Sequence, residues 1–240
     1  MNSIETEWRK LLNNILYDGL YSVKDGYGIK EILGYHTFIS NPLDMTNVLS
    51  QKPDDFVEYI RRGYFDIEGY PMSGDGIAQY LEEFQDEKCI RPFKTEDGFV
   101  YTYPERLLSM RTYDADFDLN VEVDQLGVIF DRLIDDVGTN RAVATLYNCG
   151  LDRNEHDIPC LNWLQATIRD NKLVLHVMFR SNDIYGAWPT NMFFITYIGL
   201  LLQQSLSENY PAITFKGIDY HVSSAHIYKT DLNMAKNVLR

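Results

Sequence analysis

The chain has 240 residues, of which 45% are hydrophobic, and a formal net charge of −13. A chain of this length and composition buries a full hydrophobic core, whereas so acidic a protein without a basic patch is poorly suited to bind nucleic-acid phosphates. No stretch approaches the run of about 18 to 20 apolar residues that crosses a membrane, and the amphipathic start is unlike a secretory signal. We therefore expect a soluble cytoplasmic protein whose partners include neither nucleic acid nor a membrane.

The three cysteines are Cys89, Cys149 and Cys160. They are odd in number and lack CxxC spacing, so they predict neither a disulfide framework nor a thiolate zinc site, and we expect no metal ligands. Reduced thiols are typical of the cytosol.

The sequence of the first half of the chain predicts one helix, then one strand, then three further helices. Apolar residues near the start recur with the period of an amphipathic helix. A strand follows a Gly-rich turn, and the helix after it has Pro53 and two acidic residues at its head. In chain order the predicted elements are a helix at 4–16, a strand at 28–40 and helices at 53–65, 74–88 and 121–137.

The second half predicts a sheet and two helices. A hairpin is expected to turn at Asp170-Asn171, and the segment 190–206 is apolar nearly all round, as in a helix buried against a sheet. Because no repeat or linker interrupts the pattern, we expect an α+β fold over 1–240, a single domain in which helices pack on a mixed or antiparallel sheet. The predicted elements are strands at 141–148, 160–170 and 172–180, a helix at 190–206, one or two strands in 212–228 and a helix at 231–239.

Cys160 has two interpretations. A lone cysteine in a chain of this size is more often a small buried hydrophobe than a nucleophile. Its companions favour the nucleophile: Pro159 directly precedes it, the run Arg180-Ser181-Asn182-Asp183 follows the predicted hairpin, and Asn191 stands at the head of the buried helix.

These residues resemble the motifs of the thymidylate synthase superfamily. Its members carry Pro-Cys, then Arg-Ser-x-Asp, then an asparagine eleven residues after that arginine, which is the spacing from Arg180 to Asn191. The stretch SSAHIY matches the family's His-x-Tyr, and VYTYPERL matches its tyrosine-containing segment upstream of the cysteine. The resemblance is good from about residue 100 to the end, is nearest to compact archaeal and phage members, and implies a thymidylate synthase-like fold.

The resemblance implies covalent catalysis. Cys160 would add to C6 of a pyrimidine nucleoside monophosphate, making C5 nucleophilic toward the one-carbon unit of 5,10-methylenetetrahydrofolate. Arg180 would lower the pKa of that thiol and hold the substrate phosphate; the alternative is an ion pair with Asp183 or a helix cap. Tyr103 is the equivalent of the family's tyrosine, and Glu58 is the candidate for its proton-relaying glutamate.

The same resemblance assigns the binding residues. Ser181 would donate to the phosphate, and His226 and Tyr228 would contact the sugar hydroxyl. Asp183 would lie near the base and the pterin ring, unless it caps the following helix. Asn191 presents a donor and an acceptor that match N3–H and O4 of uracil, whereas cytosine-specific relatives carry an aspartate there.

The family also implies a homodimer with shared active sites. Most members place two adjacent arginines against the phosphate of the partner subunit, but this chain has Asn140 before Arg141, so only Arg141 carries over. Lys24 or Lys30, beside the Gly-rich turn, could replace the missing guanidinium, although such lysines are usually solvated surface.

The expected reaction is reductive methylation of dUMP to dTMP. A pyrimidine nucleotide 5-hydroxymethylase acting on dUMP, dCMP or CMP stays open, because the chain stops soon after Tyr228, where long synthases continue and fold over the folate to exclude water. A catalytically inactive nucleotide-binding relative is a third interpretation. A purely structural protein would leave the shared spacing of Cys160, Arg180 and Asn191 unexplained.

Overall fold

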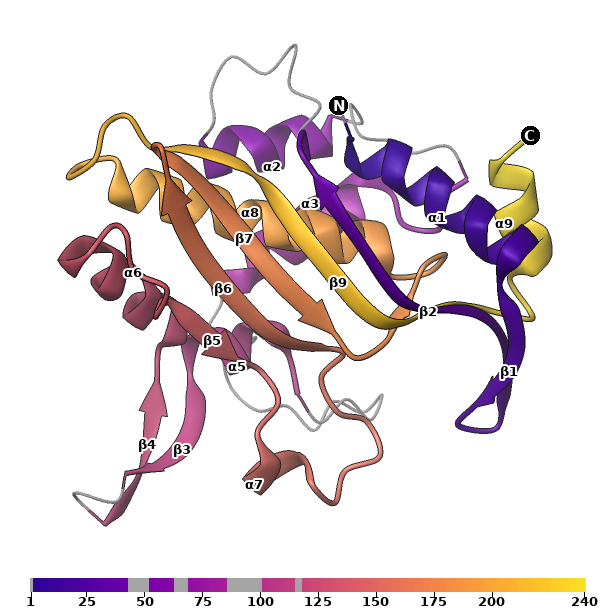
Figure 1. Ribbon diagram of the computed structural model, residues 1–240, viewed down its shortest axis with the longest axis horizontal. Coiled ribbons are helices and arrows are strands. Elements are labelled where there is room, and N and C mark those ends of the chain that lie inside the picture. Colours follow the sequence, from indigo (N-terminus) through magenta and orange to yellow (C-terminus); the bar gives the residue numbers. More distant parts are fainter. Residues whose placement is uncertain (1, 43–51, 63–68, 86–100, 115–117) are drawn as a thin grey trace.

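In the computed structural model, which describes residues 2–42, 52–62, 69–85, 101–114 and 118–240, helices pack against one mixed sheet (Figure 1). The helices are α1 (Ile4–Asp18), α2 (Pro53–Arg61), α3 (Gly74–Glu82), the 3-10 helix η1 (Glu83–Gln85), α5 (Tyr103–Leu108), α6 (Gln125–Asp135), α7 (Cys149–Asp152), α8 (Trp188–Leu206) and α9 (Leu232–Val238). The strands are β1 (Leu20–Lys24), β2 (Tyr27–Ile39), β3 (Met110–Asp114), β4 (Leu119–Val123), β5 (Val143–Thr145), β6 (Leu161–Arg169), β7 (Lys172–Phe179), β8 (Asn182–Asp183) and β9 (Thr214–Tyr228).

The main sheet has the strand order β1-β2-β9-β7-β6-β5, and β8 pairs with β9 beside this path. Neighbouring strands are antiparallel, except that β7 and β8 run parallel to β9. The parallel β7–β9 pair needs a long crossover, which α8 supplies. A separate β3–β4 hairpin stands apart from this sheet. The arrangement confirms the expected α+β fold.

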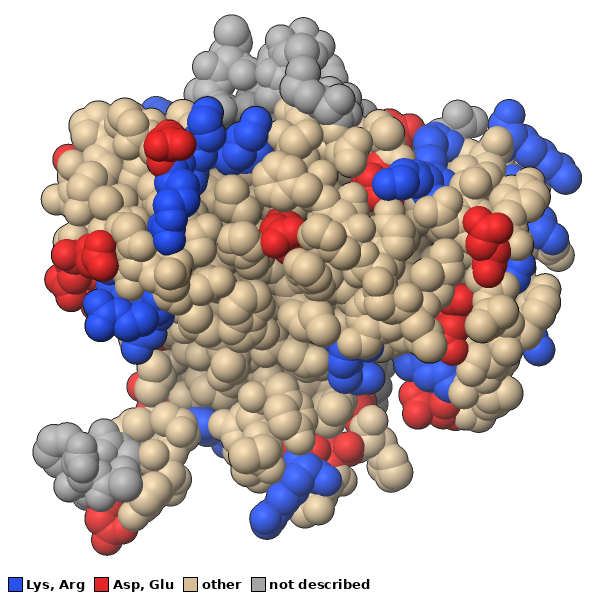
Figure 2. Space-filling view, viewed as in Figure 1, with Lys and Arg blue, Asp and Glu red and all other residues tan. Residues whose placement is uncertain are grey.

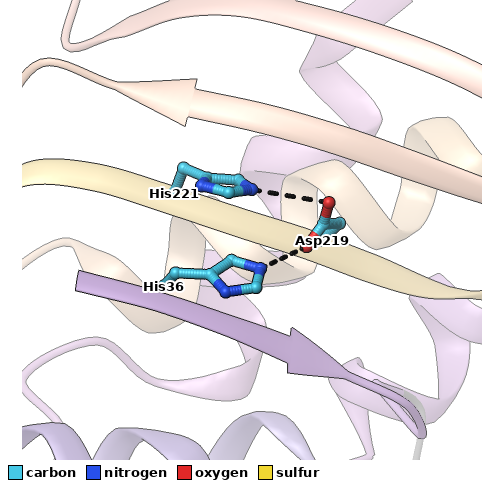
Figure 3. Close-up of side chains that lie close together, drawn as sticks. All are labelled: His36, Asp219 and His221. Atoms are coloured by element: carbon cyan, nitrogen blue, oxygen red, sulfur yellow. Dashed lines mark hydrogen bonds and ion pairs between the residues drawn. The ribbon is translucent and has the colours of Figure 1, made fainter. Parts of the chain in front are cut away.

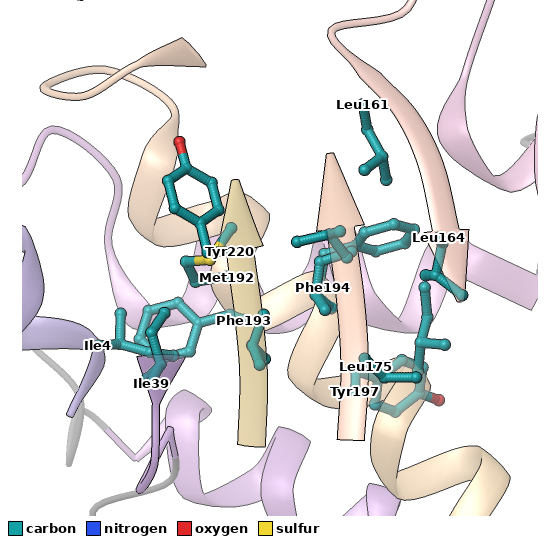
Figure 4. Packing of buried hydrophobic residues seen from close by; sticks show 14 of the residues in the cluster. Ile4, Ile39, Leu161, Leu164, Leu175, Met192, Phe193, Phe194, Tyr197 and Tyr220 are labelled. Atoms are coloured by element: carbon teal, nitrogen blue, oxygen red, sulfur yellow. The ribbon is translucent and has the colours of Figure 1, made fainter. Parts of the chain in front are cut away.

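Helix α8 forms the centre of the core. Fourteen of its 19 residues are buried, which explains why its sequence is apolar nearly all round. Figure 4 shows Met192, Phe193 and Phe194 of this helix among core side chains that project from the strands. A Cβ at Gly199 would lie 2.5 Å from the Phe215 ring, so this glycine permits the close approach of α8 to β9.

Helix α1 covers the same face of the sheet beside α8. It begins where the Ser3 side chain accepts a hydrogen bond from the Thr6 amide at 3.1 Å, a normal N-cap. Its apolar stripe is fully buried, and Trp8 Nε1 donates to the Ile184 carbonyl at 2.6 Å. This bond ties the first helix to the segment that follows β8.

The helix predicted at 121–137 is wrong at its start. Residues Leu119–Val123 form β4, in which Val121 pairs with Thr112 and Val123 with Met110 of β3. The alternation of Val and polar residues is a strand pattern, and the helix begins only at Gln125 because the Asp124 side chain caps it. The spacing at which apolar residues recur therefore changes from the two residues of a strand to the 3.6 residues of a helix at Asp124.

Other boundaries differ by a few residues. The Gly-rich turn closes a hairpin that the sequence did not predict, with Asp25 and Gly26 at positive φ between β1 and β2. The strand predicted at 141–148 shortens to β5, and residues 212–228 contain one strand, β9. Residues 63–65 and 86–88 of two predicted helices lie outside the described residues, as does Cys89.

The second face of the main sheet carries no helix among the described residues. Helix α8 passes behind β6, β7 and β9 in Figure 1, and the face toward the viewer is open. Figure 2 shows Lys, Arg, Asp and Glu mostly around the margin of this face, with few over its centre. In the part of the chain that the structure describes, no helix is long and apolar enough to span a membrane.

Candidate active site

Cys160 lies in the loop directly before β6 and is half-buried. Its carbonyl accepts from the Arg180 amide at 2.8 Å, at the end of β7. The next amide, that of Leu161, donates to the Tyr103 hydroxyl at 3.2 Å. The thiol is therefore fixed at one end of the β6–β7 hairpin, where α5 reaches the sheet.

The pKa of the Cys160 thiol is raised by burial. The charges of Arg180 and Lys24 oppose this shift, while those of Asp157 and Asp183 add to it. Arg180 therefore acts in the expected direction, but burial outweighs it. Burial therefore favours the protonated form of this thiol.

Arg180 follows β7 and turns back toward the cysteine loop. Its Nη2 donates to the Ile158 carbonyl at 2.6 Å, and its Nε donates to the Pro159 carbonyl at 3.1 Å. The guanidinium is thus held by the two residues that precede Cys160, and not by an ion pair with Asp183. Its charge lies beside the thiol while the loop keeps its orientation fixed.

Lys24 extends from the end of β1 to the end of β9. Its Nζ lies 3.3 Å from His226 Nε2 and donates to the Tyr228 hydroxyl, also at 3.3 Å. The rings of His226 and Tyr228 meet edge to face, with centroids 5.2 Å apart. The predicted His-x-Tyr pair is therefore joined by Lys24, which the sequence offered, together with Lys30, only as a candidate to replace the missing guanidinium.

His226 is fully buried. Burial and the charge of Lys24 lower its pKa to about 4, so the imidazole is neutral at neutral pH. Because an ammonium only donates, Nε2 accepts from Lys24 and the ring proton resides on Nδ1, which lies 3.4 Å from Ser181 Oγ. Ser181 is also buried, and its hydroxyl links the ends of β7 and β9.

Asp183 lies on β8, in register with His226 of β9. Its Oδ1 accepts from the Tyr185 amide at 3.1 Å, and a Cβ at Gly186 would lie 2.4 Å from its Oδ2. The side chain therefore caps a turn, and the N-cap of α8 is Ala187. Burial raises the pKa of Asp183, although hydrogen bonds from the backbone of this turn offset part of the effect.

Asn191 lies in the first turn of α8 and belongs to an amide relay. Its Nδ2 donates to Asn182 Oδ1 at 3.2 Å. Asn182, which is buried, in turn donates from its Nδ2 to the Tyr220 hydroxyl at 3.3 Å. With one amide hydrogen engaged, Asn191 keeps its Oδ1 and its second N–H for a ligand.

The structure thus brings most of the predicted residues to one end of the sheet, together with Lys24. We call this group the thiol cluster. Its members are Lys24, Tyr103, Cys160, Arg180, Ser181, Asp183, Asn191, His226 and Tyr228.

Two predicted residues lie elsewhere. Glu58 is half-exposed on α2, where it pairs with Arg61 and with Arg62, and its contacts place it outside the thiol cluster. Arg141 is exposed just before β5, and its Nε donates to Thr139 Oγ1 at 3.4 Å. The position of Arg141 leaves it outside the cluster of its own chain.

Sequence reasoning missed one residue at the thiol and left another undecided. Tyr101 interacts with the backbone of Cys160, and burial with the nearby thiol raises its pKa. The sequence Tyr101-Thr102-Tyr103 offered this second tyrosine as a signal. The two candidate lysines lie in different places: Lys30 donates to the Leu16 carbonyl at 2.5 Å, while Lys24 joins the cluster.

Comparison with known proteins places these motifs in context. A family model described as thymidylate synthase matches residues 80–240. A protein of Methanothermobacter thermautotrophicus named "Putative thymidylate synthase" is 30% identical over 247 aligned positions, covering 100% of this chain and 97% of the relative. Proteins with the same name from Methanothermobacter marburgensis and Methanopyrus kandleri are each 27% identical, covering 100% and 96% of this chain and 96% and 92% of the relatives.

Proposed function

The chain belongs to the thymidylate synthase family, and from this membership we propose that it transfers a one-carbon unit from 5,10-methylenetetrahydrofolate to C5 of dUMP, yielding dTMP. The observation that carries the proposal is the thiol cluster. A half-buried thiol, two cations, a neutral imidazole and an oriented amide meet at one end of the sheet. Attack at C6, binding of a phosphate and recognition of a base each require groups of these kinds.

Cys160 is the proposed nucleophile. Its thiol would lose its proton to solvent, the sulfur would bond to C6 of the pyrimidine, and the electron pair of the C5–C6 double bond would move to C5. Arg180 and Lys24 favour the thiolate electrostatically, and the charge of a developing enolate is stabilised by the same cations. 5,10-Methylenetetrahydrofolate would supply the methylene carbon, whose bonds to the folate nitrogens would break as C5 binds it and loses its proton to solvent. A hydride from the same folate would complete the methyl group and leave dihydrofolate, and the S–C6 bond would break to return the sulfur to Cys160 as the product leaves.

Asp183 is the residue proposed to hold the folate ring. Its half-buried carboxyl group lies on β8 within the thiol cluster, and such a group is a suitable partner for ring N–H donors. The turn at Tyr185 and Gly186 keeps it in place.

Lys24 is proposed to replace the missing second guanidinium at the phosphate. Asn140, which occupies the position of the absent arginine, is engaged within its own sheet: its Oδ1 accepts from Arg169 at 2.7 Å and its carbonyl accepts from Gln165 at 2.6 Å. Lys24, by contrast, lies with Arg180 and Ser181 around the neutral imidazole of His226. A dianionic phosphate would be attracted by both cations.

Recognition of uracil rests on the amide relay. If the Asn191 amide turned over to suit cytosine, its Oδ1 would face Asn182 Oδ1, which already accepts the present hydrogen bond. Reversal would therefore require both amides to turn and the Tyr220 hydroxyl to change its role. This supports uracil as the base, with a sugar hydroxyl at His226 and Tyr228.

The active sites are proposed to be shared in a homodimer. Arg141 is exposed and lies outside the thiol cluster of its own chain, as expected of a residue that serves the partner. Mixing Arg141→Ala subunits with Cys160→Ser subunits should restore activity at one of the two sites of a heterodimer. If verified heterodimers stay inactive, Arg141 does not act across the interface.

The decisive experiment compares substrates. The purified protein is incubated with 5,10-methylenetetrahydrofolate and with dUMP, dCMP, UMP or CMP, and products are identified by mass while dihydrofolate is followed by absorbance. We expect dTMP and dihydrofolate from dUMP, with none from the Cys160→Ser control. A 5-hydroxymethyl nucleotide without dihydrofolate would instead support the hydroxymethylase, because water then replaces hydride. No turnover with bound nucleotide would support an inactive relative.

A further inference from the structure

The Tyr70 hydroxyl is inserted into the backbone hydrogen bonds at the start of α8. In a continuous helix the Thr190 amide would donate to the Gly186 carbonyl, four residues earlier. Here the hydroxyl bridges these two groups, because it donates to the Gly186 carbonyl at 3.3 Å and accepts from the Thr190 amide, also at 3.3 Å. It lies 2.5 Å from Thr190 Oγ1 as well. A hydroxyl has one proton and two lone pairs, so it makes all three contacts at once.

The backbone pairs on either side of this bridge bond directly. The Ala187 amide donates to the Asp183 carbonyl at 3.1 Å, and the Asn191 amide donates to the Ala187 carbonyl at 3.0 Å. Ala187 is the N-cap of α8 and has no side-chain oxygen that could accept from an amide of the first turn. Tyr70 is 120 residues away in the sequence from the amide that it accepts from. It therefore supplies the cap that the local sequence lacks.

The ring of Tyr70 is held by the core beside it. It packs edge to face on Trp8, with the ring centroids 5.5 Å apart, and the Trp8 indole donates to the Ile184 carbonyl at 2.6 Å. The preceding residue, Gly69, accepts through its carbonyl from the Tyr185 hydroxyl at 3.3 Å. The segment that carries Tyr70 and the turn that follows β8 are thus bonded to each other at several points, which fixes the position of the hydroxyl.

The bridge lies between the residues proposed to contact the folate ring and the base. Asp183 comes three residues before Gly186, and Asn191 directly follows Thr190. A side chain that inserts into a helical ladder bends the chain at that point. Without the hydroxyl, the Gly186 carbonyl and the Thr190 amide would either bond directly or stay unpaired. Direct bonding would extend α8 into the turn, and both outcomes would change the position of Asn191 relative to Asp183.

We propose that Tyr70 is a positioning residue for base recognition. By holding the Gly186 carbonyl and the Thr190 amide apart, its hydroxyl fixes the first turn of α8 and keeps the Asn191 amide in the orientation that favours uracil. The inference rests on the proposed function, in which Asn191 reads the base. Tyr70 itself acts only through this turn and contacts no substrate in this role.

The test compares the dissociation constants of dUMP and dCMP, measured by calorimetry without folate so that no turnover is needed. Tyr70→Phe keeps the ring on Trp8 and removes only the hydroxyl, and we expect the preference for dUMP over dCMP to fall by about tenfold. The matched control is Tyr210→Phe, which removes a hydroxyl that donates to the Ile134 carbonyl at 3.0 Å. Both variants should lose some thermal stability, but Tyr210→Phe should keep the preference of the parent.

A second pair of variants removes or keeps the hydroxyl that contacts Tyr70. Thr190→Val should also lower the preference for dUMP, whereas Thr190→Ser should retain it. The inference is overturned if Tyr70→Phe, shown to be folded by its circular dichroism, keeps the preference of the parent. If Tyr70→Phe does not fold, an unchanged preference in Thr190→Val overturns it instead. A parent protein that binds neither nucleotide, or that prefers dCMP, would overturn the proposed function and this inference with it.

Discussion

The thiol cluster and a second group of side chains, formed by His36, Asp219 and His221 (Figure 3), draw on the same strand, β9, but use its histidines in opposite ways. His226 is fully buried next to the ammonium of Lys24, so its imidazole is neutral and accepts a hydrogen bond. His221, five residues earlier, is partly exposed beside the carboxylate of Asp219. The same side chain therefore accepts a hydrogen bond from a cation in one place and lies beside a carboxylate in the other. The sign of the neighbouring charge and the extent of burial make the difference.

The largest effect is expected from Cys160→Ser. Turnover of dUMP should fall by about a thousandfold or more, because a hydroxyl is a far weaker nucleophile than a thiolate. Nucleotide binding and thermal stability should change little, and the exposed Cys149→Ser should behave as the parent. Full activity in Cys160→Ser would return this residue to the role of a core thiol.

Lys24→Ala removes the ammonium group that lies beside His226. Loss of a charged hydrogen bond to phosphate costs about 1.5–3 kcal/mol, so the dissociation constant for dUMP should rise by about 10- to 100-fold. Lys30→Ala is the matched control, because Lys30 bonds to the Leu16 carbonyl. Calorimetric titration with dUMP measures both variants, and equal affinities for the two would exclude Lys24 from the phosphate site.

Asn191→Asp and Asn182→Ala examine how the base is read. Each mispaired hydrogen bond at a desolvated base edge costs about 1–3 kcal/mol. Asn191→Asp should shift the ratio of kcat/KM values from dUMP toward dCMP. Asn182→Ala should reduce the same ratio by releasing Asn191 to turn over. Unchanged discrimination in both variants, or a parent enzyme that uses dCMP and rejects dUMP, would contradict the amide relay.

The smallest effect, counted per pH unit, concerns the pH dependence of stability. The pKa of His226 falls from 6.5 to about 4 on folding, so between these values the unfolded chain binds a proton that the folded chain does not. The free energy of unfolding should therefore decrease as the pH is lowered through this interval, by up to about 1.4 kcal/mol per pH unit. Denaturant titrations should show a shallower dependence in His226→Gln than in the parent or in His36→Gln. An NMR titration that gives His226 a pKa near 6.5 would remove the basis of this prediction.

Sequence motifs were sufficient where function requires fixed spacing. The distance from Arg180 to Asn191 and the His-x-Tyr pair indicated the family, which the comparisons confirm, and most of the indicated residues meet in the structure. The buried hairpin and α8 were predictable for a related reason, because segments so rich in apolar residues are buried in the core of a folded protein.

The group formed by His36, Asp219 and His221 could not be predicted in this way. His36 and Asp219 are 183 residues apart and meet only because β2 pairs with β9 in one particular register. Lys24 depends on the same pairing, since β1 reaches β9 through β2. Glu58 illustrates the opposite problem, because a helical glutamate without a motif has no signal that separates a proton relay from the surface ion pairs it makes with Arg61 and Arg62.

The place of β2 in the sheet also bears on how the protein folds. Lys24 and Tyr228 are 204 residues apart, so their contact forms only after nearly the whole chain has been organised. Contacts of such long range carry a large loop-closure entropy and slow the folding reaction. The β6–β7 hairpin can form locally, but a phosphate site that includes Lys24 cannot. In refolding experiments, recovery of nucleotide binding should therefore coincide with the final kinetic phase and should not precede it.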